Sequence, residues 1–154
     1  MSRLPGPVYV AVVGASQATE ADLRDAETVG RLLGERGAYV VCGGRGGVMA
    51  AVSKGCAEAG GTVIGMLPGD DRSDANQWVS VAVPTGIGEL RNGLIVRTAD
   101  VMIAVGGAYG TLSEVALGLQ RGLHVFGLHS WEISGITAVG SPEEAVELAL
   151  AAVA

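Results

Sequence analysis

Aromatic residues are scarce in this chain, at 4% of 154 residues. Proteins that bind single-stranded nucleic acid stack bases on aromatic side chains, so this scarcity removes their usual platform. Basic residues are few as well, with ten Lys and Arg against sixteen Asp and Glu and a formal charge of −6. Because a phosphate backbone must be neutralised by a basic surface, the composition argues against a nucleic-acid partner.

Cysteine and long apolar runs are also lacking. Cys42 and Cys56 are too few for a disulfide framework and have no metal-ligand spacing, so we expect two buried thiols in a reducing compartment. No apolar run approaches the roughly 20 residues that cross a bilayer. Pro5 and Pro7 stand where the apolar core of a signal peptide would begin. We therefore predict a cytoplasmic protein without a membrane partner.

Glycine, in contrast, is abundant, with 25 residues and no Gly-X-Y period. Short apolar segments alternate with amphipathic ones, and no linker or composition shift divides the chain. This alternation is typical of a parallel sheet covered by helices on both faces. We predict an α/β fold, a single-domain doubly wound parallel sheet of Rossmann-like type over residues 1–154.

The expected elements follow from apolar runs and from helix-start signals. Thr19 is expected to cap the first helix, and Ser141, followed by Pro142 and Glu144, the last one. The expected strands are Val8–Val13, Tyr39–Cys42, Thr62–Leu67, Trp78–Val83, Val101–Val105 and Leu123–Leu128. The expected helices are Glu20–Glu35, Val48–Ala59, Gly86–Thr98, Thr111–Gln120 and Pro142–Ala152.

Three strand-to-helix turns consist of small residues, at Gly14–Ser16, Gly43–Gly47 and Gly106–Gly110. In a parallel sheet these turns emerge at one edge, where glycine lets the backbone approach a ligand and helix N-termini offer free N–H groups. That combination binds phosphate. Tight packing of helix on strand is the alternative for each turn taken alone. The predicted residues binding a phosphorylated small molecule are Gly14, Ser16, Gly43, Gly44, Arg45, Gly46, Gly47, Asn92, Gly106, Gly107, Ala108, Tyr109, Gly110 and Thr111.

Common nucleotide motifs are missing. The turn at Gly106–Thr111 has no lysine and is therefore not a P-loop, and the first turn lacks Gly-x-Gly-x-x-Gly. The single lysine, Lys54, falls inside an expected helix, which favours a solvated side chain over a pyridoxal-phosphate site. Asp70, Asp71 and Asp74 lie in a hydrophilic loop without octahedral ligand spacing, so we predict no metal.

Three charged residues lie near the glycine turns. Glu114 either contributes to the site or favours the helix dipole and closes a capping box with Thr111. Arg91 either binds the ligand or forms a surface ion pair, and Arg45 either binds phosphate or points into water. His124 and His129 have no partner that the sequence identifies.

Two motifs resemble a known family. Gly106–Glu114 resembles the Pro-Gly-Gly-x-Gly-Thr-x-x-Glu signature of the "lonely guy" (LOG) family, and Cys42–Ala50 resembles its earlier Gly-Gly-Gly-x-x-Gly-Leu-Met-Gly loop. The resemblance covers nearly the whole chain. It implies a homodimer that hydrolyses the N-glycosidic bond of nucleoside 5′-monophosphates without a cofactor, with Arg91 and Glu114 as the catalytic pair.

The sequence departs from that pattern at several positions. Gly88–Asn92 keeps only the arginine of the family's Met-His-x-Arg-Lys, and Gly106 and Ala108 replace a proline and a glycine. With the short length, these changes resemble the molybdenum-cofactor carrier proteins, which bind a phosphorylated pterin without turnover. Two functions therefore stay open, a phosphoribohydrolase and a non-catalytic carrier or sensor of molybdenum cofactor or a nucleotide. Either is expected to be a homo-oligomer, a dimer or a tetramer.

Overall fold

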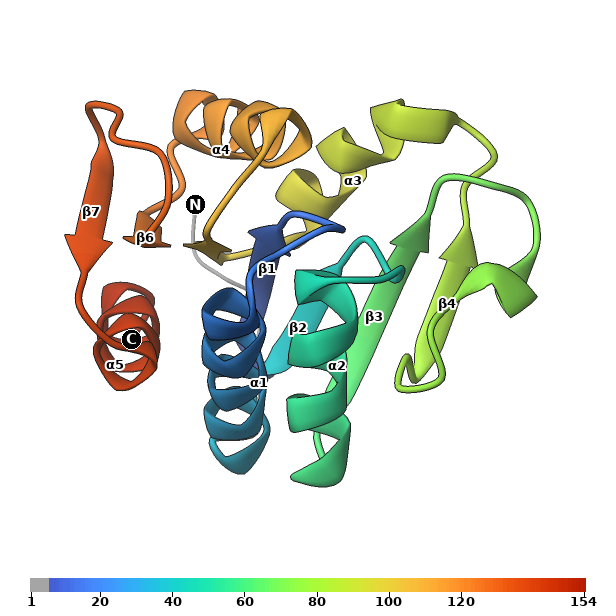
Figure 1. Cartoon of the computed structure of the whole chain (residues 1–154), viewed down its shortest axis with the longest axis horizontal. Helices are drawn as coiled ribbons and strands as arrows, with labels where there is room; N and C mark the ends of the chain where they lie inside the picture. The colour runs from blue at the N-terminus through green and yellow to red at the C-terminus, as the bar shows by residue number, and fades with distance from the viewer. Residues whose placement is uncertain (1–5) are drawn as a thin grey trace.

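Seven parallel strands form one sheet in the order β4-β3-β2-β1-β5-β6-β7 (Figure 1). The computed structural model describes residues 6–154, so Pro5 and the rest of the first five residues lie outside it. The strands are β1 (Tyr9–Gly14), β2 (Tyr39–Cys42), β3 (Thr62–Leu67), β4 (Val81–Pro84), β5 (Val101–Val105), β6 (Val125–Leu128) and β7 (Ile136–Val139). The helices are α1 (Glu20–Glu35), α2 (Val48–Glu58), α3 (Arg91–Thr98), α4 (Tyr109–Arg121) and α5 (Pro142–Ala152), with short 3₁₀ turns η1 (Arg72–Asp74) and η2 (Gly88–Leu90).

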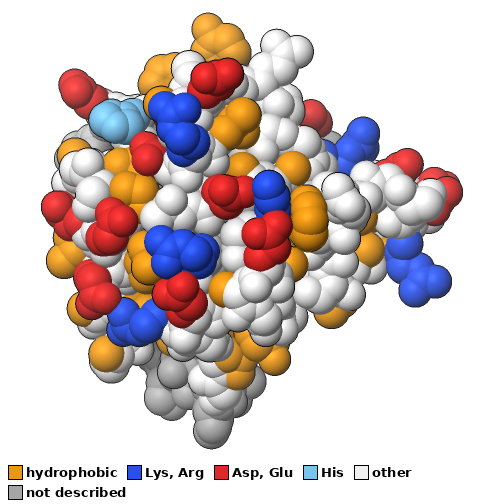
Figure 2. Space-filling model, turned by 60° about the horizontal axis from the view of Figure 1, so that its bottom comes forward, with side chains coloured by type: hydrophobic (Ala, Val, Ile, Leu, Met, Phe, Trp, Pro, Cys, Tyr) orange, Lys and Arg blue, Asp and Glu red, His pale blue; other side chains and the backbone are white. Residues whose placement is uncertain are grey.

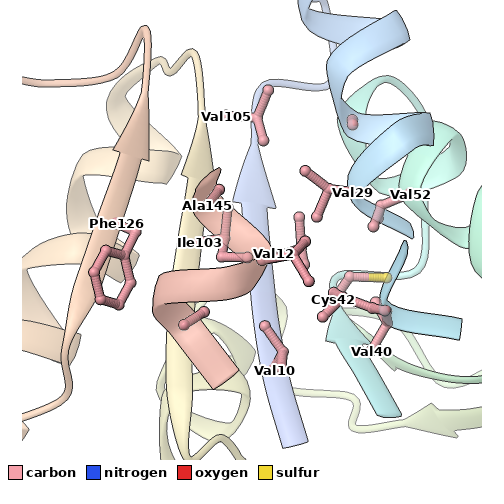
Figure 3. Packing of buried hydrophobic residues seen from close by; sticks show 14 of the residues in the cluster. Val10, Val12, Val29, Val40, Cys42, Val52, Ile103, Val105, Phe126 and Ala145 are labelled. Atoms are coloured by element: carbon pink, nitrogen blue, oxygen red, sulfur yellow. The ribbon is translucent and has the colours of Figure 1, made fainter. Parts of the chain in front are cut away.

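The sheet is buried on both faces by two helical layers. Figure 1 shows α1, α2 and α5 together on one face and α3 and α4 on the other. Successive side chains of a strand point to opposite faces, so Val10 and Val12 of β1 pack with α1, α2 and α5, as Figure 3 shows. Ala11 and Val13 pack with α3 and α4. The predicted doubly wound α/β fold is confirmed.

The point where the strand order reverses lies between β1 and β5. From β1 the chain adds β2, β3 and β4 on one side, and it then returns to place β5 on the other side of β1. The carboxyl ends of all seven strands meet at one edge because every pairing is parallel. In such sheets the crevice outside that edge, at the reversal, is the usual place for a ligand.

Both predicted helix caps are present. The Thr19 hydroxyl accepts a hydrogen bond from the Asp22 backbone N–H at 3.1 Å, and the Ser141 hydroxyl accepts one from Glu144 N–H at 3.1 Å. Each hydroxyl satisfies one of the free N–H groups that a helix start leaves.

The structure corrects two predicted elements and adds a third that was not predicted. The strand expected at Trp78–Val83 is Val81–Pro84, and the helix expected at Gly86–Thr98 is a 3₁₀ turn followed by the shorter α3. The reason is local, since Gly86 and Gly88 have φ values of 67° and 63° that an α-helix does not accept. The edge strand β7, Ile136–Val139, was not predicted, because two of its four residues are exposed and leave no apolar run.

The remaining expectations concern the two cysteines, membrane-spanning helices, metal ligands and the charge of the surface. Both Cys42 and Cys56 are free and buried, as predicted. Among residues 6–154, no helix is long and apolar enough to span a membrane, and no three His, Cys, Asp or Glu side chains gather as metal ligands. Figure 2 shows acidic and basic side chains interspersed over one face. That face therefore has no continuous basic patch of the kind that binds a nucleic acid.

Candidate functional site

A pocket of about 480 Å³ lies at the carboxyl edge of the sheet, beside the reversal between β1 and β5. It is lined by the turns after β1, β2 and β5 together with the start of α3. The sequence alone suggested this convergence because parallel strands bring their carboxyl ends together. The predicted residues that line the pocket are Gly14, Ser16, Gly43, Arg45, Gly46, Arg91, Asn92, Ala108, Gly110, Thr111 and Glu114.

The remaining predicted residues lie outside the lining. Gly44 packs on Gly65, where an added Cβ would approach the Gly65 Cα at 3.2 Å. Gly47, at φ 65°, lies against the carbonyls of the turn after β1, and the Val48 N–H donates to the Ala15 carbonyl at 3.1 Å. For Gly44 and Gly47, the alternative considered from the sequence therefore applies: these two glycines allow close packing of the backbone and do not line the pocket.

The turn after β5 is held from both sides. Gly106, at φ 61°, leaves no room for a Cβ beside the Asp22 carboxylate, and Gly107 lies beneath Trp131, whose Nε1 would be 3.0 Å from a Cβ there. Tyr109 is 83% exposed and stacks on Trp131 with ring centroids 6.3 Å apart. These three predicted residues shape the turn and its outer surface rather than the pocket wall.

Arg91 lines the pocket and is held in place by backbone carbonyls. Its Nη1 donates hydrogen bonds to the Gly43 carbonyl at 2.6 Å and to the Met66 carbonyl, at the ends of β2 and β3. Its Nε is buried and has no hydrogen-bond partner among the described residues. Burial lowers the pKa of the guanidinium, and the nearby Glu114 opposes that shift. The surface ion pair considered from the sequence is therefore not the arrangement found.

Glu114 is buried in the same pocket, with 8% of its surface exposed. Since α4 begins at Tyr109 and its N-cap Ala108 has no side-chain cap, the alternative of a capping box between Thr111 and Glu114 is not the arrangement found. Burial raises the pKa of the Glu114 carboxyl to about 8, Arg91 lowers it in part, and Glu89 adds to the rise. At neutral pH the carboxyl is therefore mostly protonated and uncharged.

Two further polar side chains are buried at the start of α4 and α3. Thr111 is 2% exposed, and its Oγ1 has no hydrogen-bond partner among the described residues. Asn92 is 8% exposed, and its Nδ2 lies 3.4 Å from the Ser113 Oγ, which donates to the Gly110 carbonyl at 2.8 Å. Because buried hydroxyls are normally paired, the Thr111 hydroxyl is a candidate hydrogen-bond partner for a ligand in the pocket.

Residues 7–152 match the SLOG cluster4 family. The chain belongs to the SLOG cluster4 family. An uncharacterized protein of Archaeoglobus fulgidus is 39% identical over 140 residues, which cover 90% of this chain and 92% of that protein. The resemblance predicted from the two glycine motifs is thereby confirmed at the level of the family.

Solved structures agree with the family assignment. A molybdenum cofactor binding protein from Rippkaea orientalis has a TM-score of 0.93 and 33% identity, covering 98% of this chain and 100% of that one. The molybdenum cofactor carrier protein of Chlamydomonas reinhardtii has a TM-score of 0.84 and 28% identity, covering 95% of this chain and 99% of that one. This SLOG cluster4 chain therefore has the fold of both proteins over nearly its whole length.

Sequence reasoning missed several contributors to the pocket of this SLOG protein. Glu89 and Met49 line it, as do Ala15 and Pro68. Asn76 supports it from the polar loop, because its Nδ2 donates to the Arg45 carbonyl at 2.9 Å and its N–H to the Gly44 carbonyl at 2.8 Å. Ala15, Met49 and Glu89 lie within segments that the sequence already singled out, Gly14–Ser16, Cys42–Ala50 and Gly88–Asn92. Pro68 and Asn76 lie in the polar loop and carry no such signal.

Proposed function

We propose that this chain binds a phosphorylated small molecule in the pocket between β1 and β5 and carries it without chemical turnover. The ligand class is the molybdenum cofactor, a phosphorylated pterin, or a nucleotide. The pocket volume of about 480 Å³ is in the range of small-molecule sites. The two similar solved structures, a molybdenum cofactor binding protein and a molybdenum cofactor carrier protein, favour the pterin.

The donors in the pocket fit a phosphate group. The turns at Gly43–Gly47 and Gly106–Gly110 offer backbone N–H groups, and the unpaired Thr111 hydroxyl is available to a phosphate oxygen. Arg91 lines the pocket, and Arg45, which is exposed, reaches it from the turn after β2. A phosphate is thus met by neutral donors and by two guanidinium groups.

The observation that carries the proposal is the buried Thr111 hydroxyl, which lines the pocket and has no hydrogen-bond partner among the described residues. Glu114 is buried in the same lining, and burial raises the pKa of its carboxyl to about 8. An uncharged carboxyl donates a hydrogen bond to a bound ligand, but it does not stabilise positive charge on a sugar as an ionised carboxylate does. Because an uncharged carboxyl can also protonate a leaving base, release of free base is the measurement that separates binding from cleavage.

A phosphoribohydrolase is the second candidate. It is favoured by one observation, the presence of both Arg91 and Glu114 in the lining of one pocket. Incubation with AMP and with isopentenyl-adenosine monophosphate separates the two functions. Free base released by the wild type and lost in Glu114→Ala contradicts the carrier proposal, whereas tight binding without release supports it.

Thr111→Val tests the phosphate site directly. Valine keeps the shape of threonine and removes a hydroxyl that has no partner, so the free energy of unfolding is expected to stay within about 0.5 kcal/mol of the wild type or to rise. Affinity for AMP, measured by calorimetry, is expected to fall about tenfold because one hydrogen bond to an anion is lost. Thr28→Val, on α1 and outside the lining of this pocket, is the matched control. Unchanged affinity in Thr111→Val contradicts the placement of the phosphate.

We also propose that the chain forms a homodimer through the outer surfaces of α3 and α4. Two exposed apolar side chains lie on these helices, Leu94 at 40% and Leu117 at 39%, and two lie at η2 just before α3, Leu90 at 78% and Ile87 at 45%. Exposed apolar side chains on neighbouring elements favour a partner that covers them.

Leu90→Glu is expected to make the dimer dissociate, because the substitution puts a charge into an apolar contact. Light scattering after gel filtration measures the change, at a protein concentration where the wild type is dimeric. Leu148→Glu, on the distant α5 and 39% exposed in the wild type, is the matched control. A monomeric wild type, or a dimer that Leu90→Glu leaves intact, contradicts this surface.

A further inference from the structure

A second pocket adjoins the first on the far side of the turn after β5. It measures about 490 Å³ and is lined by the end of β6, the loop that follows and β7. Ala108 lines the first pocket, and its carbonyl accepts a hydrogen bond from the Nε1 of Trp131, which lines the second, at 3.2 Å. This hydrogen bond therefore joins the linings of the two pockets.

An aromatic pair, Tyr109 and Trp131, lies where the turn after β5 meets the loop after β6. Tyr109 stacks on Trp131 with an interplanar angle of 29°, and it is 83% exposed. A tyrosine so exposed gains little from packing, so folding does not explain its place. The chain has two Trp, three Tyr and one Phe, and two of these six residues meet at this turn.

The second pocket also has polar groups that can meet the edge of a ring. His129, Ser130 and Glu132 line it beside the indole of Trp131. The Ser130 Oγ is buried and has no hydrogen-bond partner among residues 6–154, like the Thr111 hydroxyl in the first pocket. His129 has a φ of 53°, which an L-residue adopts at a cost and which sets the path of the loop at the end of β6.

We propose that the Tyr109–Trp131 pair is the platform on which a planar nitrogen heterocycle of the ligand stacks while its phosphate lies in the first pocket. This inference rests on the proposed function and adds the part of the ligand that the phosphate site leaves undefined. Purines and pterins share the required chemistry, a flat bicyclic ring whose edge has both hydrogen-bond donors and acceptors. Aromatic side chains bind such rings through their faces, whichever ring it is.

Fluorescence of single-tryptophan variants tests the platform. Trp78 lies in another hollow, between α1 and α2, so Trp78→Phe leaves Trp131 as the sole reporter and Trp131→Phe leaves Trp78. We expect AMP or neopterin monophosphate to quench the emission of Trp78→Phe, and ribose 5-phosphate, which has no aromatic heterocycle, to leave it unchanged. The emission of Trp131→Phe is expected not to respond to any of the three compounds.

Calorimetry of Tyr109→Leu and Trp131→Leu completes the test. Affinity for the ring-bearing probe is expected to fall about tenfold in each, since stacking on one aromatic side chain is worth that much. Affinity for ribose 5-phosphate is expected to change less than twofold, and Trp131→Phe is expected to retain most of the binding. Comparison of AMP with neopterin monophosphate then identifies the preferred ring.

The outcomes separate this inference from the function on which it rests. If the ring-bearing probes bind but Tyr109→Leu and Trp131→Leu bind them as tightly as the wild type does, the platform is overturned and the phosphate pocket stands. The same holds if Trp131 emission does not respond while a probe is bound. If none of the three probes binds, both the platform and the phosphate pocket are overturned.

Discussion

Glu114→Gln is expected to raise the free energy of unfolding at pH 9 by several kcal/mol and to have a much smaller effect at pH 5. The carboxyl has a pKa of about 8 in the folded protein against 4.5 for the free group. Each pKa unit corresponds to about 1.4 kcal/mol, so the full penalty is on the order of 3–5 kcal/mol. Glutamine has nearly the same shape and carries no charge at any of these pH values.

The sign follows from the protons bound in each state. Between pH 4.5 and 8 the folded protein holds a proton on Glu114 that the unfolded chain has released, so the stability of the wild type falls as the pH rises through this window. Above pH 8 the carboxyl is ionised in both states and the penalty stays constant. In Glu114→Gln this contribution to the pH dependence is expected to disappear.

Urea unfolding at pH 5, 7 and 9 measures the effect. Glu58→Gln is the matched control, because Glu58 is exposed at the end of α2 and lies outside the pocket, and its variant is expected to keep the pH dependence of the wild type. If Glu114→Gln and the wild type lose the same stability between pH 5 and pH 9, the carboxyl is not buried in the uncharged form. An ionised Glu114 is able to stabilise positive charge on a sugar, so that result would favour the phosphoribohydrolase.

Much of the fold was predictable because most strands are buried on both faces. Val101–Val105 has all five residues buried, and its apolar run coincides with β5. Tyr39–Cys42 and Thr62–Leu67 were predicted with the bounds that the structure has. β4 and β7 lie at the two edges of the sheet, where partly exposed residues weaken the apolar signal. Edge strands are therefore the part that sequence patterns describe least well.

The position of the site, where the turns after the strands come together, was predictable from the sequence. The protonation state and hydrogen bonds of its side chains were not. Parallel topology brings Gly14, Gly43 and Gly110 to one pocket, and that step needs no side-chain information. The charge state of Glu114 depends on burial by elements far away in the sequence, which no local pattern shows. Arg91 finds a carbonyl partner at Met66, and Trp131 reaches Ala108 across 23 positions, by the same non-local packing.

Arg91→Met is expected to weaken binding of AMP about 100-fold, the second large effect. The guanidinium is positioned by two backbone carbonyls beneath it and lines the pocket above, so its removal takes away a charge-assisted contact to the phosphate. The two carbonyls, of Gly43 and Met66, also lose their donor. We therefore expect the free energy of unfolding to fall by about 1–3 kcal/mol as well.

Gly43→Ala tests whether AMP binding needs the Arg91 guanidinium at its position in the structure, and not only an arginine at residue 91. A Cβ at residue 43 would lie 2.7 Å from the Arg91 Nη1 and 2.5 Å from the Met49 Sδ. The Arg91 guanidinium must therefore shift from its position, although the arginine is still in the chain. Calorimetry is expected to show a loss of AMP affinity close to that of Arg91→Met. Arg97→Met, exposed on the last turn of the same helix, is the control and is expected to bind like the wild type. Wild-type affinity in Arg91→Met would mean that this guanidinium supports the turn after β2 and does not bind the ligand.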